Sequence, residues 1–289
     1  MLLATCRDVP RLDPDDQPLV GALASRGIAA VPAVWDDPAV DWAAADLVVI
    51  RSTWDYPTRR AEFLEWVRAV PRLANACDVV EWNTDKHYLR DLDRAGVPVV
   101  ATAFFRPGDA VEFPASGEYV IKPAVGAGGL DTARYTPAES QLAARHGADL
   151  HAQGRAVLVQ PYLSGVDVTG ESALLFVGGC YSHSVSKAAL LAGSDRDVDG
   201  LYRPESISPR VPDPAELAVA QLALAAVPGG PERLLYARVD LLPGPQGTPV
   251  LLELELTEPS LFLAHAPGAV GRLADAIAEA ISRAAAGDR

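Results

Sequence analysis

Four charged side chains near the C-terminus have the spacing of a site that binds metal ions and phosphate. In the predicted strand YARVDLL, Asp240 follows Arg238 by two residues, so both side chains point to one face. In the predicted strand LLELELTE, Glu253 and Glu255 share a face in the same way. If the strands pair as a hairpin through PGPQG, three carboxylates converge, and this crowding requires a cation. Oxygen ligands favour Mg2+ or Mn2+.

Two other interpretations of these acidic strands stay open. They could form the solvated face of a sheet in an acidic protein. They could also bind calcium structurally, which predicts stabilisation by calcium without any effect on ATP.

Lysines supply charge that can hold phosphate oxygens. Lys122 ends the predicted strand YVIK and leads into the glycine-rich segment 126–129, GAGG. This segment has neither a P-loop nor a dinucleotide-binding pattern, but a flexible loop between two strands can fold over phosphates. Lys86, in NTDKHYL, and Lys187, at the end of YSHSVSK, are further candidates. The alternatives are a plain hairpin at 126–129 and ordinary surface lysines.

The segment VLVQPYLSGVDV could bind a nucleoside. The predicted strand ends at Gln160, and Pro161 then frees backbone groups around Tyr162 and Leu163 that can hydrogen-bond an adenine edge. Asp167 could accept hydrogen bonds from ribose hydroxyls. A simple turn is the alternative.

The first third of the chain alternates strand-like and helix-like segments. Strands are expected at 1–5, 28–34 and 45–50, with a helix at 17–26. This rhythm predicts a small parallel sheet, whose ligands gather beyond the carboxyl ends of the strands. Arg51, Trp54, Asp55 and Tyr56 follow the third strand, where Arg51 could bind a carboxylate and Asp55 an amino group. Alternatively, Trp54 and Tyr56 pack a domain interface and Arg51 pairs with Asp55.

The remaining elements position these groups. We expect helices at 84–95, 138–151, 217–226 and 269–286, and strands at 119–122, 156–160, 167–177, 181–186, 235–242 and 249–256. The segment 188–210 is predicted to be a loop and a candidate lid, with charged residues at Asp195, Arg196, Asp197 and Arg203. An insertion without function is the alternative.

Composition limits the classes of function. The 289 residues carry 25 Lys and Arg against 38 Asp and Glu, a net charge of −13, which argues against a nucleic-acid partner. The N-terminus and the apolar stretches lead us to expect neither a signal peptide nor a membrane span. Cys6, Cys77 and Cys180 are odd in number and form no CxxC motif, so we expect free thiols in the cytoplasm and no zinc site.

Taken in order, these motifs resemble the ATP-grasp superfamily of ATP-dependent carboxylate ligases. The resemblance implies an α/β (α+β) fold in which a small parallel-sheet domain precedes two ATP-grasp subdomains that clasp ATP. It implies a substrate domain at 1–84, a central subdomain with the glycine-rich loop at 85–160, and a C-terminal subdomain with the metal site at 161–289. Superfamily members are commonly dimers, so a homodimer is one expectation.

The resemblance also implies roles for the residues above. ATP would contact Lys86, Lys122, Gly126, Gly128, Gly129, Gln160, Tyr162, Leu163, Asp167 and Lys187. Two Mg2+ ions, with Mn2+ as an alternative, would bind Asp240, Glu253 and Glu255, although many relatives carry Asn at the last position. Arg238 would stabilise the acyl phosphate formed from a small-molecule carboxylate, and Lys187 the outer phosphates.

Within the superfamily, TCRDVP, RSTWDYP and LELELTEPSLFL are most similar to the D-cycloserine synthetase family. That family activates the carboxylate of O-ureido-D-serine, and a nitrogen of the same molecule closes the ring. The alternatives are a ligase that joins a carboxylate to a separate amine, as in peptide formation, and an ATP-binding protein without catalysis.

Overall fold

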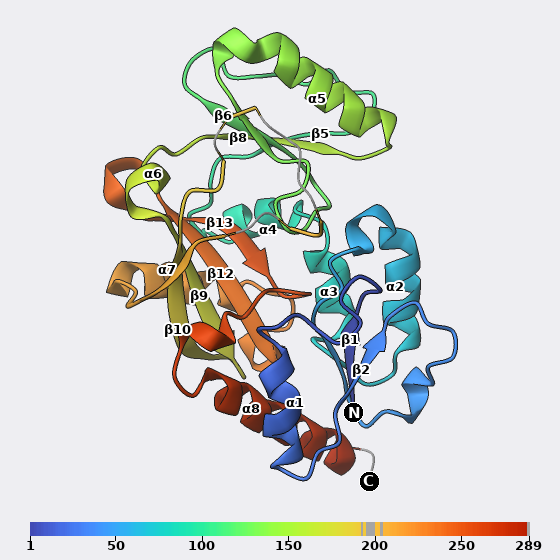
Figure 1. The fold of residues 1–289 in the computed structure, drawn as a ribbon. Coiled ribbons are helices and arrows are strands. Elements are labelled where there is room, and N and C mark those ends of the chain that lie inside the picture. Colours follow the sequence, from blue (N-terminus) through green and yellow to red (C-terminus); the bar gives the residue numbers. More distant parts are fainter. Residues whose placement is uncertain (192, 195–199, 203–204, 288–289) are drawn as a thin grey trace.

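Three β-sheets organise the chain (Figure 1). The computed structural model describes residues 1–191, 193–194, 200–202 and 205–287. The residues of the predicted lid, Asp195, Arg196, Asp197 and Arg203, lie outside this set. Within the described residues, no helix has both the length and the apolar character needed to cross a membrane.

The first sheet is parallel, as the alternating pattern predicted. Its strands are β1 (Leu2–Thr5), β2 (Val31–Val34), β3 (Val48–Ile50) and β4 (Leu73–Ala74), in the order β2-β1-β3-β4. The helices of this part are α1 (Gln17–Ala24), α2 (Arg60–Ala69) and α3 (Cys77–Asn83), with short 3-10 turns η1 (Trp42–Ala44) and η2 (Tyr56–Thr58). The turn η2 directly follows the polar segment at the end of β3, which lies beside the cavity described below.

The second sheet is antiparallel and forms a separate layer at the top of Figure 1. It contains β5 (Ala103–Phe105), β6 (Tyr119–Pro123), β7 (Ala133–Tyr135) and β8 (Val157–Pro161), in the order β5-β8-β6-β7. The 3-10 turn η3 (Pro137–Glu139) and helix α5 (Ser140–Ala152) connect β7 to β8, and α5 packs on β6 and β8. The glycine-rich loop joins β6 to β7, so it projects from one end of this sheet.

The third sheet is antiparallel and holds the acidic strands. It contains β9 (Glu171–Val177), β10 (Cys180–Lys187), β11 (Ile207–Arg210), β12 (Tyr236–Pro243) and β13 (Pro249–Glu255), in the order β11-β10-β9-β12-β13. Its helices are α4 (Tyr88–Arg94), α6 (Val166–Thr169), α7 (Pro214–Ala225) and α8 (Ala269–Gly287), and its short turns are η4 (Pro231–Arg233), η5 (Pro245–Gly247) and η6 (Leu263–His265).

Apolar side chains cover both faces of this third sheet. Val239 on β12 lies in a core shared with α4 and α7, whereas Leu175 on β9 lies in a second core shared with α1 and α8. The helices α1 and α8 lie side by side although they come from opposite ends of the chain (Figure 1). The third sheet is therefore packed on both faces, and this packing fixes the strands β12 and β13 that carry the charged side chains.

Several predicted boundaries are wrong, and each has a local cause. The helix expected at 84–95 is shorter, since α4 begins only at Tyr88 and ends at Arg94, and the preceding helix α3, which ends at Asn83, was not predicted. The strand expected at 167–177 begins at Glu171, because 166–169 form α6 and Gly170 turns the chain with φ +75°. In the predicted loop 188–210, residues 207–210 form β11, which pairs with β10. The helix expected at 217–226 begins at Pro214, behind a capping box.

Candidate active site

A cavity of about 360 Å³ is lined by residues from the regions of all three sheets. It is lined by residues of the segment after β3, the glycine-rich loop, the strand end at β8 and the face of β12 and β13. Most of the predicted site residues line it: Trp54, Tyr56, Lys86, Lys122, Gly126, Gly128, Gly129, Gln160, Tyr162, Leu163, Lys187, Arg238, Asp240, Glu253 and Glu255. The structure therefore brings together motifs that are up to about two hundred residues apart.

The acidic strands pair with the register that places their charges together. Asp240 lies opposite Glu253, and Arg238 lies opposite Glu255. A β-bulge between Asp240 and Leu241 shifts the register by one residue, so Leu241 pairs with Leu251. Leu251 therefore enters the core, and Leu252, which the simple alternation places on the core face, lines the cavity instead.

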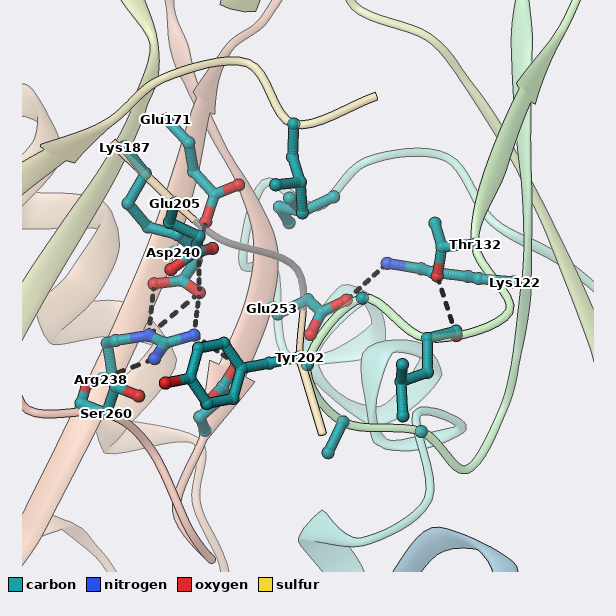
Figure 2. Close-up of a pocket in the computed structure, with 18 of the residues that line it drawn as sticks. Lys122, Thr132, Glu171, Lys187, Tyr202, Glu205, Arg238, Asp240, Glu253 and Ser260 are labelled. Carbon is teal, nitrogen blue, oxygen red and sulfur yellow. Dashed lines mark hydrogen bonds and ion pairs between the residues drawn. The ribbon is translucent and has the colours of Figure 1, made fainter. Parts of the chain in front are cut away.

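Glu253 is bound by two lysines from the opposite wall of the cavity. Its Oε1 accepts a hydrogen bond of 2.6 Å from Lys122 Nζ, and its Oε2 lies 3.6 Å from Lys86 Nζ. Figure 2 shows Lys122 reaching across to Glu253. Burial alone would raise the pKa of Glu253, but the two ammonium groups hold it well below its usual range.

A second cluster surrounds Lys187. Its Nζ lies 2.6 Å from Glu171, 3.2 Å from Glu205 and 3.6 Å from Asp240. These side chains gather on the other side of the view in Figure 2, together with Arg238. Burial raises the pKa of Glu171 to about 7, with Lys187 opposing this shift and Asp240 adding to it.

Among the described residues, Arg238, on β12, is the fourth cation that lines the cavity, after Lys86, Lys122 and Lys187. Its Nε and Nη2 donate to Asp240 at 2.9 Å, it also pairs with Glu255, and its Nη1 donates to the Ser260 carbonyl at 3.2 Å. Burial raises the pKa of Glu255 to about 7, although Arg238 opposes the shift. The Asp240 and Glu253 carboxylates raise the pKa of Glu255 further.

The donor set fits divalent cations and a nucleotide together. As the side chains lie, no three His, Cys, Asp or Glu of the described residues stand close enough to hold a metal ion. Each predicted ligand instead faces a cation of the chain. Carboxylates nevertheless outnumber lysines and arginines along the cavity, and two of them, Asp240 and Glu253, add to the rise that burial causes in the pKa of Glu255. Phosphates that engage the lysines would free oxygen ligands of the kind that Mg2+ prefers.

The glycine-rich loop contacts a segment that we call the bridging segment, residues 200–202. Gly128 has φ +62°, and a Cβ atom there would lie 2.5 Å from the Leu201 carbonyl oxygen. The ring of Tyr202 meets Trp54 edge-on at 5.2 Å. Through these contacts, the bridging segment links the glycine-rich loop to the N-terminal sheet region.

Two predicted nucleotide contacts are arranged differently from the simplest expectation. Gln160 is buried and lines the cavity, and its Nε2 donates to Thr102 Oγ1 at 2.8 Å. Asp167 is exposed and does not line the cavity, and its carboxylate accepts a 2.5 Å hydrogen bond from the Tyr162 hydroxyl. Glu171, four residues later, does line the cavity.

The N-terminal substrate candidates divide into two groups. Trp54 and Tyr56 line the cavity, whereas Arg51 and Asp55 do not. Arg51 is buried, lies 3.0 Å from Asp16, and donates from Nη2 to the Pro259 carbonyl at 2.8 Å. Asp55 accepts a 2.9 Å hydrogen bond from the Trp35 indole. The alternative of an Arg51–Asp55 pair is therefore wrong, since Arg51 takes Asp16 as its partner.

Sequence reasoning missed five carboxylates among the described residues that line the cavity: Asp13, Asp15, Glu171, Glu205 and Glu258. Glu171 begins β9 and Glu205 lies before β11, in a segment whose pairing only the tertiary structure decides. Glu258 carried a detectable signal, since it directly extends the acidic run LELELTE.

This combination of fold and site defines an ATP-grasp protein. Solved structures share the fold: a RimK domain ATP-grasp protein from Sphaerobacter thermophilus (TM-score 0.66, 18% identity, 95% of this chain and 98% of that chain) and the D-alanine–D-alanine ligase of Bacillus anthracis (TM-score 0.63, 17% identity, 100% and 99%). The latter has also been solved in complex with ATP.

The sequence defines the family more narrowly. The chain is 40% identical to the cycloserine biosynthesis protein DcsG of Streptomyces lavendulae, over 93% of this chain and 94% of that protein. A crystal structure of D-cycloserine synthetase DcsG superimposes with a TM-score of 0.89 at 36% identity, covering 97% of this chain and 99% of that chain. A family profile for the N-terminal domain of D-cycloserine synthetase DcsG matches residues 1–75.

The chain therefore belongs to the D-cycloserine synthetase family. It is an ATP-dependent ligase that forms a C–N bond, and the predicted fold class and enzyme class are confirmed.

Proposed function

We propose that this ligase closes the ring of D-cycloserine by activating the carboxylate of O-ureido-D-serine with ATP. The observation that carries the proposal is the 40% identity to a cycloserine biosynthesis protein along nearly the whole chain. The matching N-terminal family profile also covers Trp54 and Tyr56, which line the same cavity as Arg238. The substrates are ATP and a small-molecule carboxylate. We also propose that the protein is cytoplasmic, that it forms a homodimer, and that its three domains meet at residues 84/85 and 160/161.

The chain's own groups suit the binding of a triphosphate. Lys86, Lys122 and Lys187 are the lysines of the sequence, and all line the cavity as point charges for phosphate oxygens. The loop 126–129 lies beside Lys86, whose Nζ donates to the Gly126 carbonyl at 2.9 Å. Gln160, Tyr162 and Leu163 would contact the adenine.

Asp240, Glu253 and Glu255 would hold two Mg2+ ions, with Mn2+ as a substitute. Bound magnesium supplies charge neutralisation for the transferring phosphoryl group. Arg238 lies on the same face and is fixed by Asp240 and the Ser260 carbonyl, so its guanidinium is preorganised to stabilise an oxyanion on the activated carboxylate. Water must be kept out during the reaction, because it would hydrolyse an acyl phosphate.

One coupled assay tests this function. Purified protein, ATP and Mg2+ are incubated with O-ureido-D-serine, its L-isomer or a panel of amino acids, and ADP and product masses are recorded. Cycloserine formation with stoichiometric ADP supports the proposal. ADP release only with another carboxylate and a separate amine would indicate an intermolecular ligase. Tight ATP binding without turnover on any substrate would contradict catalysis of this class.

A further inference from the structure

Glu258 lies in the cavity but outside its network of ion pairs. It follows the acidic strand β13 and lines the cavity together with Trp54, Tyr56 and Arg238. Its residue is only 9% exposed. Within the described part of the chain, no lysine or arginine nitrogen lies within 4 Å of its carboxylate, although the other acidic groups of the β12–β13 face each have such a partner.

The backbone around Glu258 is fixed by side chains from distant elements. The Trp54 indole donates to the Glu258 carbonyl at 3.0 Å, and Arg51 donates to the Pro259 carbonyl at 2.8 Å. On the other side, the Tyr236 hydroxyl donates to the Thr257 carbonyl at 2.8 Å. Three consecutive carbonyls are thus held by buried donors. Such a second layer of contacts is how a fold fixes the position of a reacting group.

The side chain of Glu258 is held as well. The Tyr56 hydroxyl interacts with its carboxyl group and opposes the rise of its pKa, and no backbone N–H of the described residues donates to this carboxyl group. A carboxylate oriented by one tyrosine retains free lone pairs, so it can accept a further proton donor from a molecule in the cavity.

We propose that Glu258 is a catalytic residue that accepts the proton of the attacking nitrogen during ring closure, with Tyr56 as its positioning residue. This inference rests on the proposed function. The nitrogen forms a bond to the activated carbonyl carbon, the bond from that carbon to the phosphate oxygen breaks, and its electron pair leaves with phosphate. The proton of the nitrogen moves to the Glu258 carboxylate. The ring nitrogen still carries the carbamoyl group, whose bond to nitrogen is then hydrolysed by water, so that this group ends as carbon dioxide and ammonia and all atoms balance.

The surroundings of Glu258 suit this task. Burial raises its pKa to about 8, and the Glu255 carboxylate adds to the shift, whereas Lys86, Tyr56 and Arg238 oppose it. A carboxylate with an ordinary pKa is a weak base, and a base works best when its pKa is near the working pH. The remaining acidic groups of the β12–β13 face are engaged with lysines and Arg238, on the side proposed for phosphate and metal.

The variant Glu258→Gln tests the proposal by separating activation from ring closure. Gln keeps the size of the side chain and can bond Tyr56, but it cannot take up a proton. Cycloserine formation from O-ureido-D-serine is measured alongside hydroxamate formation from the same substrate with added hydroxylamine, a strong nucleophile that traps the acyl phosphate. We expect the ring-closure kcat to fall about 100- to 10,000-fold, while hydroxamate formation stays within about threefold of the wild type.

Two results would overturn the assignment. Equal losses of both products would place Glu258 in ATP binding or activation, and unchanged ring closure would remove it from catalysis. If His265→Asn rather than Glu258→Gln separates the two products, the imidazole that also lines the cavity is the proton acceptor and the proposal is wrong. If the wild type makes no cycloserine, the proposed function itself is refuted. The assay of the wild type alone shows this, so the two failures can be told apart.

Tyr56→Phe provides a second test should Glu258→Gln fail to fold, as judged by its melting temperature and ATP binding. Phe preserves the ring stacked on Phe63 at 4.8 Å but removes the hydroxyl that orients Glu258. Ring closure should then fall about tenfold with hydroxamate formation unchanged. Equal loss of both products in this variant would overturn the proposal independently.

Discussion

Glu253 blocks the lysines that ATP needs, and this leads to a testable asymmetry. Lys122 and Lys86 both face its carboxylate, at 2.6 and 3.6 Å. Phosphate oxygens must therefore compete with Glu253 unless magnesium gives the carboxylate another partner. We predict that Glu253→Gln binds ATP more tightly than the wild type in EDTA, although it loses turnover with magnesium.

The size of the effect follows from the contact that is lost. A hydrogen bond between charged groups contributes about 1.5–3 kcal/mol, and Gln can still accept one but cannot neutralise the lysines. Since each 1.4 kcal/mol is a factor of ten, the affinity for magnesium-free ATP should rise about 10- to 100-fold. The unliganded variant should lose a similar amount of folding free energy, because two buried ammonium groups lose their counter-ion.

Calorimetric titration of ATP, in EDTA and then in excess Mg2+, measures the change in affinity, and chemical denaturation of the protein without ATP measures the change in folding free energy. Glu118→Gln is a matched control, since it removes the same charge from an ion pair with Arg134 at residues that do not line the cavity. The control should bind magnesium-free ATP as the wild type does. If Glu253→Gln binds magnesium-free ATP no more tightly than this control, Glu253 does not compete with phosphate and the reasoning fails.

Three further predictions concern the loop, the pH dependence and the N-terminal part. Gly128→Ala should lower kcat/KM for ATP about tenfold, because its Cβ would displace the bridging segment. The control Gly27→Ala, at φ +74° with nothing within 4 Å of the added Cβ, should cost only about 1 kcal/mol of stability. If both variants have the same kcat/KM for ATP, the contact between Gly128 and the bridging segment does not matter for catalysis. The pKa of Glu258 is raised in the folded chain, so its contribution to stability is complete below about pH 4.5 and is lost as the pH rises through about 8. Between about pH 4.5 and 8, the melting temperature of Glu258→Gln should therefore fall less than that of the wild type. Arg51→Met should destabilise the fold by about 3–5 kcal/mol in chemical denaturation, since it leaves Asp16 buried without its partner, and a normal stability with a raised KM alone would instead show that Arg51 binds substrate.

The composition of the active-site face was predictable because strand periodicity is a local property. The spacing of Arg238 and Asp240, and of Glu253 and Glu255, places each pair on one face in any regular strand. The turn between the strands then suggests that the two pairs meet, as the register confirms. The order of the motifs likewise predicted the ATP-grasp class before any coordinates were considered.

The same local reasoning failed where the chain departs from regular geometry. The bulge beside Asp240 moves Leu251 into the core and Leu252 to the cavity, and two consecutive leucines give no sign of which of them will be buried. Gly170 ends α6 before β9, so Asp167 lies outside the cavity and Glu171 lines it.

The partners of the charged groups were decided only by the tertiary structure. Arg51 stands four residues from Asp55, yet it pairs with Asp16, 35 residues earlier, because parallel β-strands place distant segments at the same sheet edge. Lys122 meets Glu253 across 131 residues of sequence. A side chain's type and spacing fix what it can do and which face it occupies. Its partner, its burial and hence its pKa depend on how separate sheets pack, and no short segment of sequence contains that information.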